Sequence, residues 1–343
     1  MKKINLLLVS VLLSANLFTA RSNEQQRTPF MTHSFSASSI RAVEAATSGG
    51  SITVNGDAGS EAIVEVYVSR ENWSAERVKQ TIEENYTIDI KVEGGKLYAV
   101  AKSKNRIANW NQLGLSISFK ISVPKQVASN LSTSGGSIHI AHLTGSQDFK
   151  TSGGSLTIEH VSGKIAGTTS GGSITVSNSS DNIDLKTSGG SIKANDCSGK
   201  INLKTSGGSV KMDNLSGNID ASTSGGSITA NDVNGTLKAG TTGGSVRLNG
   251  ISGSVDAKTS GGSMTVDMEA VSDYVKLSNS GSTHLSLPSG KGYNLKVRGN
   301  KVETSGMKDF RGNIESRSIE GTVGAGGTEI DVRTSQRASL TFK

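Results

Sequence analysis

The chain has 343 residues, a length that allows two globular domains or one long repetitive domain. Its hydrophobic content of 34% and aromatic content of 4% are low for a globular core, and its formal charge of +7 is modest. Because the sequence shows no stripe of Lys and Arg interleaved with aromatic residues, we do not expect a nucleic-acid-binding protein.

Residues 1–20 have the pattern of a secretory signal peptide. Lys2 and Lys3 form the charged start, residues 4–13 form the apolar core, and Ala20 is a small residue at which cleavage is expected. The apolar run is too short for a membrane-spanning helix, so no transmembrane anchor is expected. The signal predicts export to the periplasm, the cell surface or the medium. Residues 21–30 are polar and predict a loose linker.

Residues 31–132 predict the first coils and a cap with one inserted helix. Ser74 is a good N-cap, and Val78, Ile82 and Tyr86 follow it at a regular helical spacing. Residues 93–96 read Glu-Gly-Gly-Lys, which is typical of a hairpin turn. Alternating apolar and polar residues predict strands at 63–68, 88–92, 97–101 and 115–123.

A strict repeat follows, and it occupies residues 133–276. The motif Thr-Ser-Gly-Gly-Ser recurs at a constant spacing, with Thr-Thr-Gly-Gly-Ser once, and a separate copy begins at Thr47. A fixed period of this kind indicates a repeat architecture. The copies of the regular array begin at Thr133, Thr151, Thr169, Thr187, Thr205, Thr223, Thr241 and Thr259.

Within each repeat we number the positions from that first Thr. Positions 6 and 8 are apolar around a polar position 7, and positions 15 and 17 are largely apolar around a polar position 16. This alternation predicts two short strands per repeat, each with one buried face. The Gly-Gly of positions 3 and 4 predicts one corner, through positive φ. An Asn or Asp pair leading to Gly at position 13 predicts the other.

One repeat has too few apolar side chains for a core, so successive repeats must stack and share one. The sequence therefore predicts an all-β fold, a single-chain β-solenoid (β-helix) of 18-residue coils. After residue 276 the period breaks and Tyr293 and Phe310 add aromatic bulk. Residues 277–343 are therefore expected to form C-terminal coils and a cap, with strands within 328–340.

A family resemblance becomes specific at the start of the array. Val-Pro-Lys at residues 123–125 leads into Asn-Leu-Ser-Thr-Ser-Gly-Gly-Ser-Ile at 130–138, after a strand pair and one acidic helix. Gly-Ser-Ile half-repeats follow, with Ser-Gly-x-Ile between them. Over residues 35–340 this pattern resembles the bacterial putative-adhesin β-strand-repeat family, which comprises exported or membrane-linked proteins of unknown function. The resemblance implies a β-helix and supplies no catalytic motif.

Metal binding has two weak candidates, His142 and His160, which occupy position 10 of neighbouring repeats. Their backbones should lie about 4.8 Å apart, but two His form an incomplete site. Calcium is not expected, because calcium-binding repeats read Gly-Gly-x-Gly-x-Asp, whereas Ser-Ile follows Gly-Gly here and no Asp lies in that turn. The acids of the second corner, Asp196, Asp213 and Asp232, do not share one position. We therefore expect no metal and no cofactor.

Catalysis would require carboxylates gathered on one face. Position 16 holds Asp184, Asp220 and Asp256, but Lys186, Lys204 and Lys258 lie two positions further on, which favours ion pairing between coils. Ice binding is disfavoured because Lys193, Lys211 and Arg247 interrupt position 7. We expect the Thr of position 1 to bond along the stack instead. The single cysteine, Cys197, falls at apolar position 11 and should be buried and inert.

The sequence thus favours a non-enzymatic, exported, adhesin-like binding or structural β-helix protein of the cell envelope. Its partner would be an unknown surface ligand, such as a glycan or an envelope component, because rigid repeats present ligand contacts many times over. The alternative is a β-helix carbohydrate-active enzyme, a polysaccharide lyase or hydrolase. A cleft of acids and aromatics would favour the enzyme, and flat uniform sheets would favour the binding module.

Overall fold

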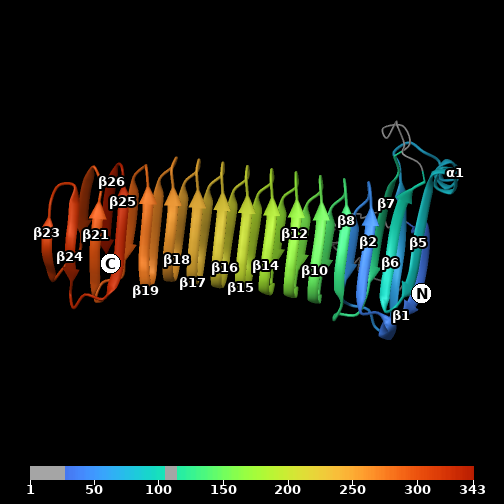
Figure 1. Cartoon of the computed structure of the whole chain (residues 1–343), viewed down its shortest axis with the longest axis horizontal. Helices are drawn as coiled ribbons and strands as arrows, with labels where there is room; N and C mark the ends of the chain where they lie inside the picture. Colours follow the sequence, from blue (N-terminus) through green and yellow to red (C-terminus); the bar gives the residue numbers. More distant parts are fainter. Residues whose placement is uncertain (1–27, 105–113) are drawn as a thin grey trace, which may run out of the picture.

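The computed structural model describes residues 28–104 and 114–343. The predicted signal peptide and most of the predicted linker lie outside these residues. The described chain is all-β, with 26 strands joined in one open sheet and a single α-helix. In these residues no helix is long and apolar enough to cross a membrane. Figure 1 shows the strands side by side in a long row, with the N-terminal strands at one end and the C-terminal strands at the other.

The N-terminal part carries eight strands and the helix α1 (Ala75–Asn85), besides a short 3-10 turn at Ala37–Ser39. Its strands are β1 (Met31–Ser36), β2 (Ala42–Thr47), β3 (Ile52–Asn55), β4 (Glu61–Ser69), β5 (Tyr86–Glu93), β6 (Lys96–Ser103), β7 (Ser116–Ser122) and β8 (Ala128–Thr133). The helix begins at the predicted N-cap, where the Ser74 side chain accepts a hydrogen bond from the Arg77 amide. The predicted hairpin is confirmed, since Glu93 pairs with Lys96 in antiparallel β5 and β6.

The repeats and the C-terminal part carry the remaining strands. In the repeats these are β9 (Ile138–Ala141), β10 (Thr144–Thr151), β11 (Leu156–Glu159), β12 (Ser162–Thr169), β13 (Ile174–Ser177), β14 (Ser180–Thr187), β15 (Ile192–Thr205), β16 (Val210–Thr223), β17 (Ile228–Thr241), β18 (Val246–Thr259) and β19 (Met264–Asn279). After them come β20 (Thr283–Leu287), β21 (Tyr293–Arg298), β22 (Lys301–Ser305), β23 (Phe310–Ile314), β24 (Ser318–Val323), β25 (Thr328–Thr334) and β26 (Arg337–Phe342).

Equivalent positions of successive repeats pair in parallel. Ile183 lies opposite Ile165 on one side and opposite Ile201 on the other, so both partners are the same position of a neighbouring repeat. The first half of each repeat pairs in the same way, as Ile174 does with Ile192. Positions 6, 8, 11, 15 and 17 are buried in nearly every repeat, and Ile201 exposes only 1% of its surface. The predicted division into buried and exposed positions is confirmed.

The number of strands per repeat differs from the prediction in part of the array. The first three repeats have two strands each, but β15 to β18 each run through the second corner as one strand of 14 residues. The ladder is kept there because only one residue, such as Asp196, leaves it. Side chains also join successive repeats at this corner: the Asn214 amide donates to Asp196 at 2.7 Å and that of Asn231 to Asp213 at 2.6 Å.

The Thr-Ser-Gly-Gly-Ser motif joins each repeat to the one before it. Thr205 donates its hydroxyl to the carbonyl oxygen of Gly190 at 2.7 Å and accepts the amide of Gly208 at 3.3 Å. The amide of Ser209 donates to the hydroxyl of Ser191 at 3.1 Å. The Thr contact recurs in every copy of the regular array. The Thr of position 1 therefore bonds along the stack, through glycine carbonyls, and is buried.

The position-4 glycine is required by close approach of two backbones. A Cβ atom added at Gly172 would lie 2.0 Å from the carbonyl oxygen of Gly154, whereas one added at Gly171 would lie 3.6 Å from its nearest neighbour, Gly153. Our expectation of positive φ at this corner is wrong, because none of the described glycines with positive φ occupies position 3 or 4 of a repeat. Lack of space, rather than backbone conformation, selects the second glycine.

The second corner does use left-handed backbone, as predicted. Position 10 has positive φ in every repeat of the array but the last, for example 51° at Asp196 and 55° at Asn214, where Asn and Asp are tolerated. The glycine of position 13 also has positive φ, 113° at Gly217, and a Cβ atom there would lie 2.2 Å from the carbonyl oxygen of Gly199.

Both ends of the row change strand direction. At the N-terminal end β5 lies antiparallel to β6, and β4 lies between β1 and β7 and antiparallel to both. At the other end, β19 has register shifts against β18 and then pairs with β25 through Val275 and Ile330. Beyond β25 come parallel β21 and then antiparallel β24 and β23. Irregular strands therefore end the array on both sides, which limits further pairing at its edges.

The two glycines of one motif give a direct test of the close approach. We expect Gly172→Ala to lower the free energy of unfolding by about 1–3 kcal/mol, because the added methyl group fits only if the backbone of the preceding repeat moves away from it. Gly171→Ala, the matched control, should be nearly neutral. Urea unfolding of the two variants measures the difference, and equal losses would contradict the geometry at position 4.

The buried Thr contacts give a second test. Thr205→Val keeps the shape of the side chain but leaves the Gly190 carbonyl and the Gly208 amide without their partner. We expect a loss of about 1–3 kcal/mol in the free energy of unfolding. Ser206→Ala, at the exposed neighbouring position, is the control and should cost little. Thermal and urea unfolding would both detect the difference, and an unchanged Thr205→Val protein would show that the contact does not stabilise the stack.

Candidate functional site

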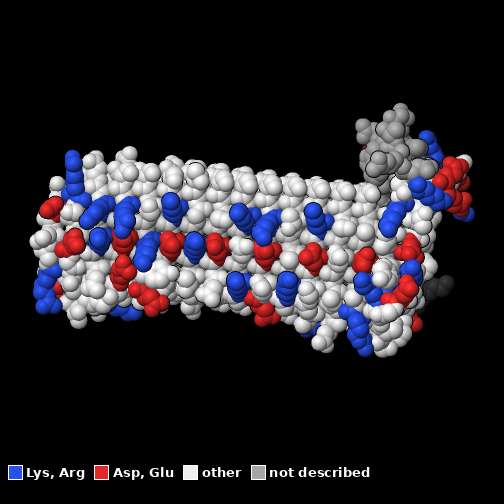
Figure 2. Space-filling view, viewed as in Figure 1, with Lys and Arg blue, Asp and Glu red and all other residues white. Residues whose placement is uncertain are grey.

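One face of the molecule, formed by β10, β12, β14, the C-terminal halves of β15 to β19, β25 and β21, carries two parallel rows of charged side chains. Figure 2 shows one row that is basic along the molecule and a neighbouring row in which acidic and basic groups alternate. The register identifies both rows, since residues paired across strands lie side by side. We call them the basic row and the alternating row.

The alternating row consists of position-16 residues and their partners in the C-terminal strands. Each residue lies opposite one of the other sign, so the row has little net charge. Opposite charges paired across strands contribute roughly 0.2–1 kcal/mol each. In order of pairing, the row is Asp220, Lys238, Asp256, Lys276, Asp331, Lys296 and Glu320.

The basic row consists of position-18 residues and their partners. Followed by pairing from Lys150 in β10 to Arg298 in β21, the row contains no Asp or Glu. The residues between its cations are small: Thr168, Ser222, Gly240 and Ser278. Arg298 lies directly opposite Arg333, although like charges opposite one another are destabilising. In order of pairing, the cations are Lys150, Lys186, Lys204, Lys258, Arg333 and Arg298.

Two shallow depressions adjoin these rows near the C-terminal end. The first has a volume of about 440 Å³ and mixes charges of both signs, including Asp256, Lys276 and Glu329. The second has a volume of about 290 Å³, and its charged lining residues are Lys258, Arg298 and Arg333, with no carboxylate. The rest of its lining is polar: Thr259, Ser260, Ser278, Asn279, Ser280, Thr334 and Ser335. We call this second depression the basic groove.

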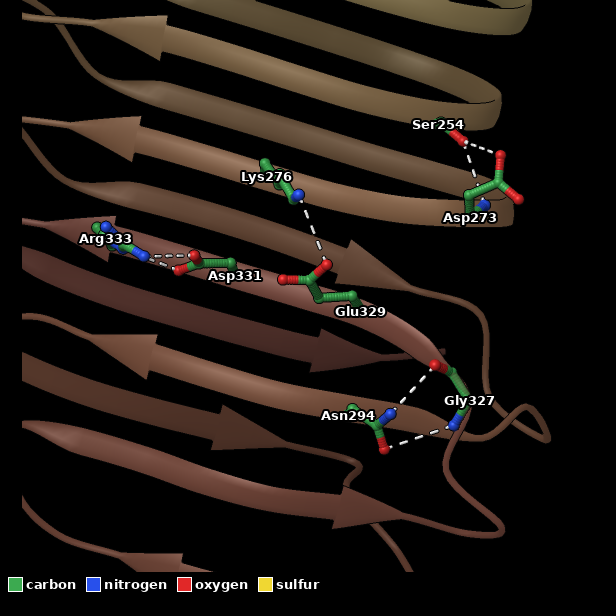
Figure 3. Close-up of polar contacts among 8 residues, drawn as sticks. All are labelled: Ser254, Asp273, Lys276, Asn294, Gly327, Glu329, Asp331 and Arg333. Carbon is green, nitrogen blue, oxygen red and sulfur yellow. Dashed lines mark hydrogen bonds and ion pairs between the residues drawn. The ribbon is translucent and has the colours of Figure 1, made fainter.

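The close-up in Figure 3 shows how two acids of the first depression, Glu329 and Asp331, are held. Lys276 reaches Glu329 across the strands at 3.5 Å. Arg333 lies along its own strand against Asp331, with hydrogen bonds of 3.1 Å from Nε and 2.7 Å from one terminal nitrogen. This contact raises the pKa of the Arg333 guanidinium above its usual range, first by hydrogen bonding and then by attraction. Both carboxylates are therefore ion-paired.

Polar contacts also shape the loops beside this depression. In Figure 3 the side-chain amide of Asn294 forms two hydrogen bonds with the backbone of Gly327. It donates to the carbonyl oxygen at 3.1 Å and accepts from the backbone amide at 3.4 Å. Ser254 accepts the backbone amide of Asp273 at 3.2 Å where β18 and β19 lose register. The irregular end of the array is thus fixed by specific hydrogen bonds.

The sequence did not reveal the basic row. Arg333 and Arg298 extend it, but they lie in β25 and β21, which the repeat period does not place. The part of the basic row that the sequence does show is a Lys that recurs at position 18 of four repeats, at Lys150, Lys186, Lys204 and Lys258. No aromatic residue lines the basic groove, so the stacking surface typical of nucleic-acid sites is missing from it.

The structure brings His142 and His160 together as the repeat spacing predicted. Their rings are stacked, with 5.1 Å between centroids and planes 16° apart. His142 Nδ1 lies 3.3 Å from Asn55 Oδ1. In residues 28–104 and 114–343 no group of three or more His, Cys, Asp or Glu is arranged to hold a metal ion. The pair is a stacked surface contact at the second corner.

One position-16 acid of the enzyme alternative, Asp184, is held by its neighbours. It forms an ion pair with Lys186 at 2.8 Å on the same strand and accepts the Asn202 amide at 2.7 Å from the next repeat. The ion pair is therefore within a repeat, whereas we expected pairing between successive repeats. At the corner, Asp213 accepts the Asn231 amide and pairs with Lys211 at 3.3 Å, and these contacts lower its pKa. This corner acid acts as a structural turn residue.

The cysteine prediction agrees with the structure. Cys197 is buried, with 2% of its surface exposed, and its Sγ donates to the carbonyl oxygen of Asn195 at 3.1 Å. Burial raises the pKa of the thiol above its usual range. A raised pKa leaves less of the reactive thiolate at any given pH.

Comparisons with known proteins add little. No family model and no curated protein matches the chain. Among solved structures, a "putative cell adhesion protein" from Clostridium sporogenes has 8% identity and a TM-score of 0.26, covering 91% of this chain and 98% of its own. A "putative adhesin" from Bacteroides fragilis has 10% identity and a TM-score of 0.25, covering 91% of this chain and 96% of its own. At these TM-scores neither similarity supports a conclusion about this chain.

Thiol labelling tests the position-11 assignment. We expect Cys197 to resist a thiol reagent in native buffer at neutral pH and to react stoichiometrically in denaturant. The matched control is Ser198→Cys combined with Cys197→Val, which places a thiol at an exposed neighbouring position and should label rapidly in the folded protein. Equal native rates for the two proteins would show that position 11 is open to solvent.

Proposed function

We propose that the chain is a β-solenoid that serves as a non-enzymatic, exported, adhesin-like binding or structural module of the cell envelope. The observation that carries this proposal is the parallel pairing of equivalent positions in successive repeats, which repeats one surface chemistry along the molecule. A binding surface of that kind presents many equivalent contacts, and several weak contacts together give high avidity.

The arrangement of charge also supports a binding role. The alternating row is internally compensated, while the basic row beside it keeps its excess of cations. An excess that extends over many strands suits an extended ligand better than a small substrate. The depressions near the rows are shallow and polar, unlike the deep, mostly apolar pockets that usually hold small substrates.

A non-enzymatic role is proposed on the same grounds. Two of the three carboxylates of the first depression are engaged in ion pairs, Glu329 with Lys276 and Asp331 with Arg333, and so serve as contacts between side chains of the sheet. Glycoside hydrolysis needs one carboxyl group that is protonated at working pH beside one that is not. Export and an envelope location follow from the signal peptide predicted in residues 1–20.

A two-part experiment tests the proposal. The full chain, purified after export from an expression host, is applied to an array of glycans, envelope polysaccharides and matrix proteins. It is also incubated with the same polysaccharides and assayed for new reducing ends and unsaturated ends. We expect retention on at least one arrayed polymer without release of ends. Release of ends would contradict the non-enzymatic role, and absence of retention on every arrayed polymer would contradict the binding role.

A further inference from the structure

The basic groove has three cations and no carboxylate in its lining, and of the three only Arg333 is ion-paired in the described part of the chain, with Asp331 beside the groove. Lys258, Arg333 and Arg298 belong to one row on neighbouring strands, with Ser278 between the first two. All three are exposed. Within the described residues, neither Lys258 nor Arg298 has a carboxylate within ion-pair distance. The groove is therefore a site of concentrated positive charge on a chain with a modest overall charge.

Arg333 keeps free hydrogen-bonding capacity despite its contact with Asp331. A guanidinium has five N–H donors in a planar fork, and the contact uses one from Nε and one from a terminal nitrogen. The Arg333 side chain is 64% exposed while that of Asp331 is 16% exposed, so the acid fixes one edge of the guanidinium and the remaining donors stay accessible to solvent. A guanidinium held in this way is prepared to bind an oxyanion.

The pairing of Arg298 with Arg333 has an energetic consequence. Two cations directly opposite each other on adjacent strands destabilise the pairing of β21 with β25. An anion bound between them would remove that repulsion. The hydroxyl groups of Ser260, Ser278, Ser280 and Ser335 surround the cations and can bond to further oxygen atoms of a ligand.

We propose that the basic groove binds the anionic groups of an acidic polysaccharide, with Lys258, Arg298 and Arg333 as the charged contacts. Three strand spacings separate Lys258 from Arg298, about 14 Å, so the row spans more than one anionic group. Hydroxyl-rich lining suits sugar hydroxyls, and the absence of aromatic residues from the lining disfavours nucleic acid, which needs stacking. The basic row continues through Lys204, Lys186 and Lys150 and extends the track along the array.

This inference rests on the proposed binding role and is tested with defined probes. Fluorescent dextran sulfate and polygalacturonate represent sulfated and uronic-acid polymers, neutral dextran is the uncharged control, and single-stranded DNA represents a different polyanion. Binding to the full chain is measured by fluorescence anisotropy at increasing salt. We expect one or both acidic polysaccharides to bind, more weakly at higher salt, while neutral dextran does not bind and DNA binds more weakly.

Two triple variants locate the contact. Lys258→Gln, Arg298→Gln and Arg333→Gln together should raise the Kd for the acidic polysaccharide at least about tenfold and reduce the salt dependence. The matched control removes the same charge from position 7, in the other half of the repeats, through Lys193→Gln, Lys211→Gln and Arg247→Gln. Its Kd should change much less. Thermal melting confirms that both variants are folded, which their exposed positions favour.

Each contrary outcome overturns the inference. Equal losses in the two triple variants would show that only overall charge matters, and tighter binding of DNA than of either polysaccharide would show that the groove is a nucleic-acid site. Binding of none of the acidic polysaccharides would also overturn it. If the full chain is then retained by neutral glycans or proteins on the array, the proposed function survives without this groove. If the full chain is retained on no arrayed polymer, both the proposed binding role and the inference about the basic groove are contradicted.

Discussion

The contact between consecutive repeats at the Thr-Ser-Gly-Gly-Ser corner is the constraint on which the rest of the structure depends. There the backbones approach so closely that position 4 has no room for a Cβ atom, and a buried Thr hydroxyl links one repeat to the next. Any insertion or deletion would move both contacts out of place, so the period stays constant throughout the array. The fixed period in turn aligns every other position into rows.

Most of the regular array could be predicted because its pairing partners are a fixed distance apart in the sequence. Alternation within the repeat identified most of the buried positions, the recurrence of apolar residues at position 11 identified Cys197, and the capping residue identified α1. The C-terminal end could not be predicted in this way. There Val275 pairs with Ile330, and no period relates the two residues. Sequence reasoning also assigned the Gly-Gly corner to backbone conformation, because the crowding between successive repeats is a tertiary effect that the sequence does not display.

The same division explains why the candidate site was only partly visible. The His pair and the position-16 acids were found because they recur with the period, and the structure shows the His rings stacked and Asp184 ion-paired with Lys186. The basic groove was missed because two of its three cations, Arg333 and Arg298, come from non-repeating strands. A functional surface placed where a regular array meets an irregular end thus combines residues that the sequence separates. The basic row that begins in the repeats therefore continues into the C-terminal strands β25 and β21.

Distances between spin labels would test the stacking most directly. In a Cys197→Val background, labels at the exposed position-14 residues Lys164 and Thr236 are four pairing steps apart, and labels at Ser146 and Thr236 are five. Stacked coils predict separations of about 19 and about 24 Å, growing by about 4.8 Å per added repeat. Separations that do not grow with repeat number, or that grow by tens of ångströms per repeat, would contradict the account.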